Sequence, residues 1–217
     1  MGEISAGLVK QLREMTGAGM MDCKAALQEA NGSFDAAIEV LRKKGLKNID
    51  KRASKVAAEG VMGVYSHPGD QIVAVVELNC ETDFVARNPD FRERARELAM
   101  QVAAMRPRYL SRESVPQEVI EKEKEIALEQ LNESQKKNAD KIIPGKLEKF
   151  YEDTVLLCQA FIKDDSGKKT VQDIIGELSV QCGEKITIGR FQRFEVGEGV
   201  EKSTMDFAAE VASMVSN

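Results

Sequence analysis

Apolar residues in the first part of the chain recur with a helical period and are interrupted at intervals. Ser5 is a typical helix cap, and Leu8, Leu12 and Met15 after it share one face of a helix. The interruptions that follow are the glycine-containing segments Gly17-Ala-Gly19, Asn31-Gly32 and Gly45. The pattern predicts a compact bundle of three short helices over residues 1–52.

The periodicity then changes to the alternation that is typical of strands. Val61–Ser66 and Gln71–Leu78 are predicted strands around a turn with Pro68-Gly69 at its centre. Ile186–Val196 is predicted as a third strand, and its alternation breaks near Phe191, as at a β-bulge. We therefore expect a three-stranded antiparallel sheet.

Amphipathic helices accompany these strands. Residues 89–105 carry one apolar stripe that would cover a sheet, and Asn88-Pro89 supplies a cap followed by proline at the first helical position. Thr170 and Asp173 match a capping box that opens another helix, which Gly183 closes. Strands and helices together predict an α+β core.

The segment from about 116 to 163 is predicted to form a projecting helical hairpin, the arm. From Pro116 to about Lys137 charged residues are dense and the apolar stripe is narrow, which is typical of an exposed helix. A break at Ile142–Gly145 would separate a second helix that returns antiparallel to the first.

The predicted domains are the bundle at 1–52, the α+β core at 53–202 with its arm, and a C-terminal helical module at 203–217. Phe207 lies on the apolar face of that last helix. Such a short amphipathic helix needs a further surface to lie on.

Charge and composition narrow the function classes. The 217 residues include 36 acidic and 31 basic residues, a net charge of −5, so the chain as a whole would not attract phosphate backbones and no direct nucleic-acid binding is expected. Residues 42–55 form a basic hinge or linker helix, which fits either a solvated face or a contact with an acidic partner. No run of 18 apolar residues and no signal peptide is found, so we expect no membrane association and a cytoplasmic location.

The residues that carry enzyme chemistry are sparse. Four cysteines occur singly, without a C-x-x-C pair, and are expected to be reduced and free of metal. The single histidine, His67, lies in a predicted turn, and no phosphate-binding glycine motif occurs. We therefore expect no catalytic residues, no metal and no cofactor.

The stretch Asn79–Asn88 is the strongest candidate for a functional site. It leaves an apolar strand and enters a capped helix, so Thr82–Val85 would lie on a short, firmly held corner. In one interpretation this corner presents Phe84 and Asp83 together to a partner. In the other, Phe84 belongs to the core and Asp83 caps a turn, because large aromatic side chains are usually buried.

A second candidate surface lies in the bundle. Met20 and Met21 follow a glycine-flanked loop, where adaptable methionine side chains suit the binding of a protein. Burial of at least one of them in the core of the bundle remains an alternative.

Several motifs resemble the elongation factor Ts family, over essentially the whole chain. The two most specific are Leu12-Arg-Glu-Met-Thr-Gly-Ala-Gly-Met-Met-Asp-Cys-Lys-Ala-Ala-Leu27 and Cys80-Glu-Thr-Asp-Phe-Val-Ala-Arg87. Residues 146–161, 193–202 and 206–211 resemble the family's arm and C-terminal module. The chain resembles short members of the family, because the convincing strands amount to one of the two related sheet subdomains of longer members.

The resemblance implies a nucleotide exchange factor, not an enzyme, that binds elongation factor Tu in its GDP-bound and nucleotide-free states. It implies that Thr82, Asp83, Phe84 and Val85 disturb the magnesium site of that GTPase. It also implies that the bundle, which is ubiquitin-associated-like, docks on the GTPase through residues that include Met20, Met21 and Lys24. Phe207 in the terminal helix would add contact area.

Two further expectations complete the sequence analysis. Pairing of two chains through their sheets would give a homodimer and a two-plus-two complex with the GTPase. The alternative function is a non-catalytic interaction adaptor in translation that does not exchange nucleotide.

Overall fold

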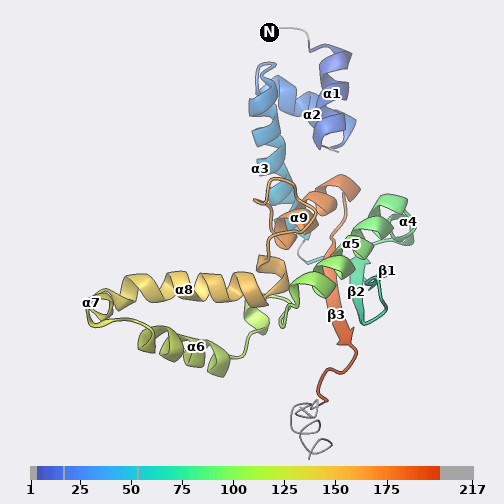
Figure 1. Ribbon diagram of the computed structural model, residues 1–217. Coiled ribbons are helices and arrows are strands. Elements are labelled where there is room, and N and C mark those ends of the chain that lie inside the picture. Colours follow the sequence, from blue (N-terminus) through green and yellow to red (C-terminus); the bar gives the residue numbers. More distant parts are fainter. Residues whose placement is uncertain (1–3, 17, 53, 201–217) are drawn as a thin grey trace, which may run out of the picture.

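The computed structural model describes residues 4–16, 18–52 and 54–200, and within them a mixed fold of helices and one antiparallel sheet (Figure 1). The sheet has three strands in the order in which they occur in the chain: β1 (Glu59–Ser66), β2 (Ile72–Cys80) and β3 (Thr187–Glu195). The predicted strands are confirmed, with ends that differ by one or two residues. The central strand β2 pairs with both neighbours.

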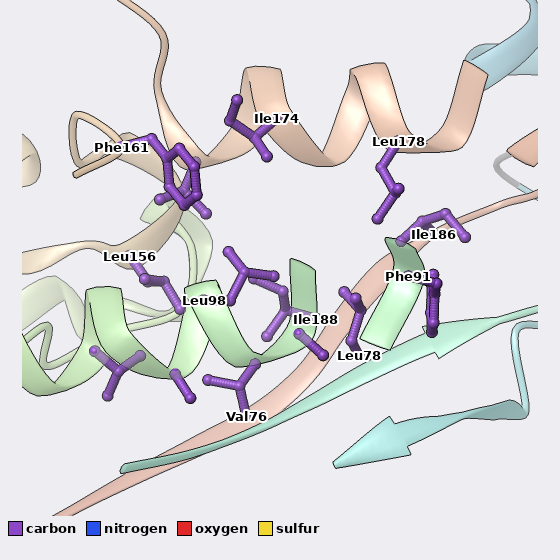
Figure 2. Packing of buried hydrophobic residues seen from close by; sticks show 14 of the residues in the cluster. Val76, Leu78, Phe91, Leu98, Leu156, Phe161, Ile174, Leu178, Ile186 and Ile188 are labelled. Atoms are coloured by element: carbon purple, nitrogen blue, oxygen red, sulfur yellow. The ribbon is translucent and has the colours of Figure 1, made fainter. Parts of the chain in front are cut away.

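One face of the sheet is covered by α5 (Pro89–Met105), and α9 (Val171–Cys182) packs against the same core. Figure 2 shows the core side chains gathered between α5, α9 and the sheet. Gly63 of β1 faces α5 so closely that an added Cβ would lie 2.0 Å from the carbonyl oxygen of Ala95. The sheet and the helix therefore approach backbone to backbone at this point. The largest fully buried apolar side chains of this core include Val76, Leu78, Phe91, Leu98, Val102, Leu156 and Val171.

The register of the sheet shifts once, on β3. Glu77 lies opposite Arg190 and Leu78 lies opposite Ile188, so Gly189 is the extra residue of a β-bulge. The alternation pattern indicated a bulge near Phe191, two residues further along. Glycine suits the bulge position, because a Cβ there would lie 2.6 Å from Oδ1 of Asn79.

The N-terminal helices enclose a core of their own. This core contains buried residues from all three helices, among them Val9, Leu12, Cys23, Leu27 and Leu41. The helices are α1 (Ala6–Thr16), α2 (Met20–Glu29) and α3 (Phe34–Arg52).

The prediction that Gly45 ends the third helix is wrong, because α3 continues to Arg52. A glycine inside a helix costs only about 1 kcal/mol relative to alanine, and most of the residues that follow Gly45 tolerate a helix well. The long helix α3 reaches α9 and contacts it (Figure 1).

The arm projects from the core as two adjacent helices, joined at its tip by a short one (Figure 1). These helices are α6 (Gln117–Glu129), α7 (Glu133–Lys136) and α8 (Ala139–Thr154). The chain returns to the core through a 3-10 helix, η2 (Leu156–Cys158). Another 3-10 helix, η1 (Arg112–Ser114), precedes α6, and its Arg112 binds Glu148 of α8 through two hydrogen bonds of 2.7 and 2.6 Å.

The predicted break in the arm at Ile142–Gly145 is wrong. Pro144 lies inside α8, close to its start, and the chain turns earlier, at Asn132. The Asn132 side chain accepts a hydrogen bond from the Gln135 amide, and the Gln135 side chain accepts one from the Asn132 amide. This capping box starts the new helix and fixes the turn. Pro144 is the sixth residue of α8, so it lacks the amide that would bond to the Asp140 carbonyl, and the helix continues with one backbone hydrogen bond fewer.

Candidate functional site

Residues 82–85 form a segment that lies where the central strand passes into helices. β2 ends at Cys80, and Asp83–Ala86 form the single-turn helix α4. Asn88 then caps α5 by accepting a hydrogen bond from the Asp90 amide at 2.9 Å, and Pro89 is its first residue, as predicted. The segment is therefore held between the central strand and the main covering helix.

Phe84 points away from the core, with 81% of its surface exposed. Its neighbours behave differently, because Val85 is half-buried and packs against the main core while Ala86 is buried. The side chains around Phe84 thus anchor α4 while the aromatic ring faces solvent. The interpretation of Phe84 as a core residue is wrong.

Asp83 forms an ion pair with Arg87 one turn later, at 2.9 Å. The residue at the cap position of α4 is Thr82, and its side chain makes no capping hydrogen bond. Asp83 is the first residue of the helix, where a carboxylate favours the positive end of the helix dipole. Residues 82–85 therefore present a half-exposed carboxylate beside an exposed aromatic ring.

Two carboxylates that are distant in the sequence hold the entry to α4. Glu184 Oε2 accepts hydrogen bonds from the amides of Glu81 and Thr82, each at 3.0 Å, and its Oε1 accepts one from the Thr82 hydroxyl. In return, Glu81 Oε1 accepts a hydrogen bond of 2.7 Å from the Lys185 amide. Hydrogen bonds to ionised acceptors are stronger than neutral ones, so these contacts fix the entry to the segment.

Two further contacts hold the same segment. The Cys80 thiol donates a hydrogen bond of 3.1 Å to the Thr82 carbonyl, and Arg92 Nε donates one of 3.2 Å to the Ala86 carbonyl. Burial, together with the nearby negative charge of Glu184, raises the pKa of Cys80. The thiol therefore stays protonated and remains a donor at neutral pH.

The second candidate surface is on the bundle, where Met20 is 46% and Met21 is 75% exposed at the start of α2. Lys24 is also exposed, whereas Cys23 between them is buried. Both side chains are exposed, so the alternative that at least one of them is buried in the core of the bundle is wrong. Met15 at the end of α1 is 69% exposed, although it was expected to share a face with Leu12, which is buried.

The remaining expectations concern the C-terminal module, membrane association and metal binding. Phe207 and the predicted C-terminal module lie outside the described residues. Among the residues that are described, no helix is long and apolar enough to cross a membrane. The same part of the chain holds no group of three or more His, Cys, Asp or Glu residues placed to bind a metal ion.

Glu184 is the residue of this site that sequence reasoning missed. The pattern predicts the helix that Gly183 ends, but it gives no signal that the next residue reaches Thr82, 102 positions earlier. Only the pairing of β2 with β3 brings the two segments together.

Comparison with known proteins gives a consistent result. A family model described as "Elongation factor TS" matches residues 7–198. The chain is 54% identical over 217 residues to "Elongation factor Ts" of Desulforamulus reducens, covering 99% of each chain. It is 57% identical over 202 residues to the protein of that name from Moorella thermoacetica, covering 92% of this chain and 98% of the relative. The corresponding protein of Myxococcus xanthus is 50% identical over 214 residues, covering 98% and 97%.

The contrast between two phenylalanines gives a test of the site geometry. Phe84→Ala should change the free energy of unfolding by about 0.5 kcal/mol or less, because an exposed ring has few contacts to lose. Phe91→Ala, in the adjacent helix, should cost about 3–5 kcal/mol, because the Phe91 ring is fully buried. Urea denaturation of both variants measures the difference, and a large loss in Phe84→Ala would place its ring in the core.

Proposed function

Because this chain belongs to the elongation factor Ts family, we propose that it is a translation elongation factor that binds elongation factor Tu·GDP and promotes release of the GDP. GTP then rebinds to the emptied GTPase. The factor makes and breaks no covalent bond, so it needs no catalytic residue and no cofactor of its own. The observation that carries the proposal is the exposed Phe84 on a short helix that is held at both ends.

Exchange follows from a difference in affinity. A factor that binds the nucleotide-free GTPase more tightly than the GDP-bound form lowers the affinity for GDP by the same coupling free energy. About 1.4 kcal/mol of coupling is enough for a tenfold effect. Residues 82–85, here called the exchange segment, supply this difference if their contacts form fully only when the magnesium and phosphate site has moved.

Phe84 and Asp83 have separate parts in this mechanism. The Phe84 ring inserts between packed elements of the GTPase near the phosphates and displaces the backbone that holds Mg²⁺. Asp83 competes for groups that order the same site. Its ion pair with Arg87 is exposed at the Arg87 end, and such surface pairs are worth about 0–1 kcal/mol, so the carboxylate can change partners at little cost.

The remaining surfaces provide affinity. The bundle, as a ubiquitin-associated-like module of residues 1–52, docks on the GTPase through the exposed Met20, Met21 and Lys24. The core of residues 53–202 then presents the exchange segment. The terminal module of residues 203–217, with Phe207, adds contact area. Unchanged association after replacement of Met20 and Met21 by serine would contradict the docking role of the bundle.

One face of the sheet, which no element of the described residues covers, suits a second copy of the chain. Met62, Val64 and Phe194 are all more than half exposed there, opposite the face that α5 covers. Pairing of two such faces would bury these side chains and give a homodimer, and with two GTPases a two-plus-two complex. A monomer in sedimentation equilibrium at high protein concentration would contradict this assembly.

An interaction adaptor without exchange activity is the alternative function, with the basic segment 42–55 as a contact for an acidic partner. No feature of the described residues favours it over exchange, because it gives no role to an exposed ring held at a strand end. A soluble factor of translation acts in the cytoplasm, and the proposal includes that location.

Release of fluorescent GDP from elongation factor Tu tests the proposed function. We expect the chain to accelerate release in proportion to its concentration until it saturates. Gel filtration with and without excess GDP provides the second readout, because an exchange factor should be displaced by GDP. Co-elution that is indifferent to GDP, together with unaccelerated release, would establish the adaptor instead.

Asp83→Asn tests the role of the carboxylate. Asparagine has nearly the same shape, and the exposed ion pair with Arg87 that it removes is worth about 0–1 kcal/mol, so stability should change by no more than that. If the charge acts on the partner's cation, the variant should slow GDP release most when Mg²⁺ is plentiful and least after chelation.

The dependence on magnesium distinguishes the alternatives for Asp83. Equal slowing at every Mg²⁺ concentration would place Asp83 in an ordinary docking contact. No slowing at all would leave it with a structural role only.

A further inference from the structure

We propose that Glu184 is the positioning residue of the exchange segment: its carboxylate sets the direction in which Phe84 is presented, through hydrogen bonds to Glu81 and Thr82. This inference rests on the proposed exchange function. It assigns a role in that function to a residue outside the exchange segment, in the turn between α9 and β3.

The strand pairing ends before the exchange segment, so another group has to bind the backbone amides there. Pairing between β2 and β3 stops at Asn79 and Thr187, and pairing between β1 and β2 stops at Cys80. The amides of Glu81 and Thr82 therefore lie beyond the last strand pair. Glu184 Oε2 accepts a hydrogen bond of 3.0 Å from each of these amides, so a side chain replaces the backbone acceptors that a neighbouring strand would supply.

Glu184 is itself held in place by the turn that follows α9. Gly183 adopts a left-handed conformation with φ 68°, which ends the helix and turns the chain toward the sheet. The hydroxyl of Ser179, a buried residue of α9, donates a hydrogen bond to the Glu184 carbonyl. Glu81 completes the arrangement by accepting from the Lys185 amide, so the two chain segments hold each other.

The same turn also lies next to the link with the docking bundle. Lys185 Nζ donates a hydrogen bond of 2.9 Å to the carbonyl of Lys55, which follows α3. Helix α3 in turn contacts α9. The turn at Gly183–Lys185 therefore connects the exchange segment with the bundle that is proposed to dock on the GTPase. Loss of the Glu184 hydrogen bonds should lower the rate of exchange while association with the GTPase is retained.

GDP release at increasing factor concentration tests this positioning role in the full chain. Glu184→Ala should lower the maximal rate of release about tenfold while the concentration for half-maximal effect changes by about twofold or less. Glu184→Gln should recover most of the rate, because its carbonyl can accept from both amides and its amide can donate to the Thr82 hydroxyl. Glu177→Ala, which removes an exposed carboxylate of α9 paired with Lys169, is the matched control and should act as the unmodified chain does.

Amide hydrogen exchange on the free protein separates this inference from the proposed function. Glu184→Ala should speed exchange at Glu81 and Thr82 about tenfold or more, while the amide of Val76 in β2 keeps its protection. Full release activity in Glu184→Ala would overturn the inference. Loss of protection at Val76 would also overturn it, because the effect would then be unfolding of the core. An unmodified chain that fails to accelerate GDP release would contradict the proposed function, while hydrogen exchange would still report whether Glu184 holds the segment.

Discussion

A helix of one turn cannot persist in water by itself, because nucleation fixes several residues for very few hydrogen bonds. The helix Asp83–Ala86 therefore depends on contacts at both of its ends. The carboxylate of Glu184 holds the entry, and Arg92 together with the Asn88 cap holds the exit. Because these contacts use the backbone and leave the Phe84 side chain without a role in packing, the ring is free to face a partner.

The rest of the fold can be understood as support for that arrangement. Glu184 reaches Thr82 only because β3 pairs with β2, and β3 is placed by the core that α5 and α9 share with the sheet. An exposed phenylalanine gives up the burial free energy that such a large side chain would gain in a core, about 1.5–3 kcal/mol. Single exposed apolar side chains are common on protein surfaces, so exposure alone does not mark a binding surface. The functional signal is the combination of an exposed aromatic ring with a backbone that is held at both ends.

The secondary structure was largely predictable because it is encoded locally. The 89–105 helix and its Asn88 cap were correct, and so was the Thr170 capping box, because each depends on residues within one turn of each other. The errors at Gly45 and Pro144 have one cause: a residue that disfavours helices does not end one when its neighbours favour it and the lost hydrogen bonds are few. The sequence left the exposure of Phe84 as one of two alternatives. Glu184 was missed because its contact joins residues that are 102 positions apart in the sequence.

The central claim is that exchange depends on the exposed ring of Phe84 and not on affinity alone. The most direct measurement is the rate of GDP release from elongation factor Tu at saturating Phe84→Ala, alongside the association of the same variant with the nucleotide-free GTPase. Leu128→Ala, which shortens an exposed apolar side chain of the arm, is the control. The account predicts a maximal release rate lowered about tenfold or more by Phe84→Ala, with the fold intact and association retained through the bundle. A maximal rate equal to that of the unmodified chain would contradict it.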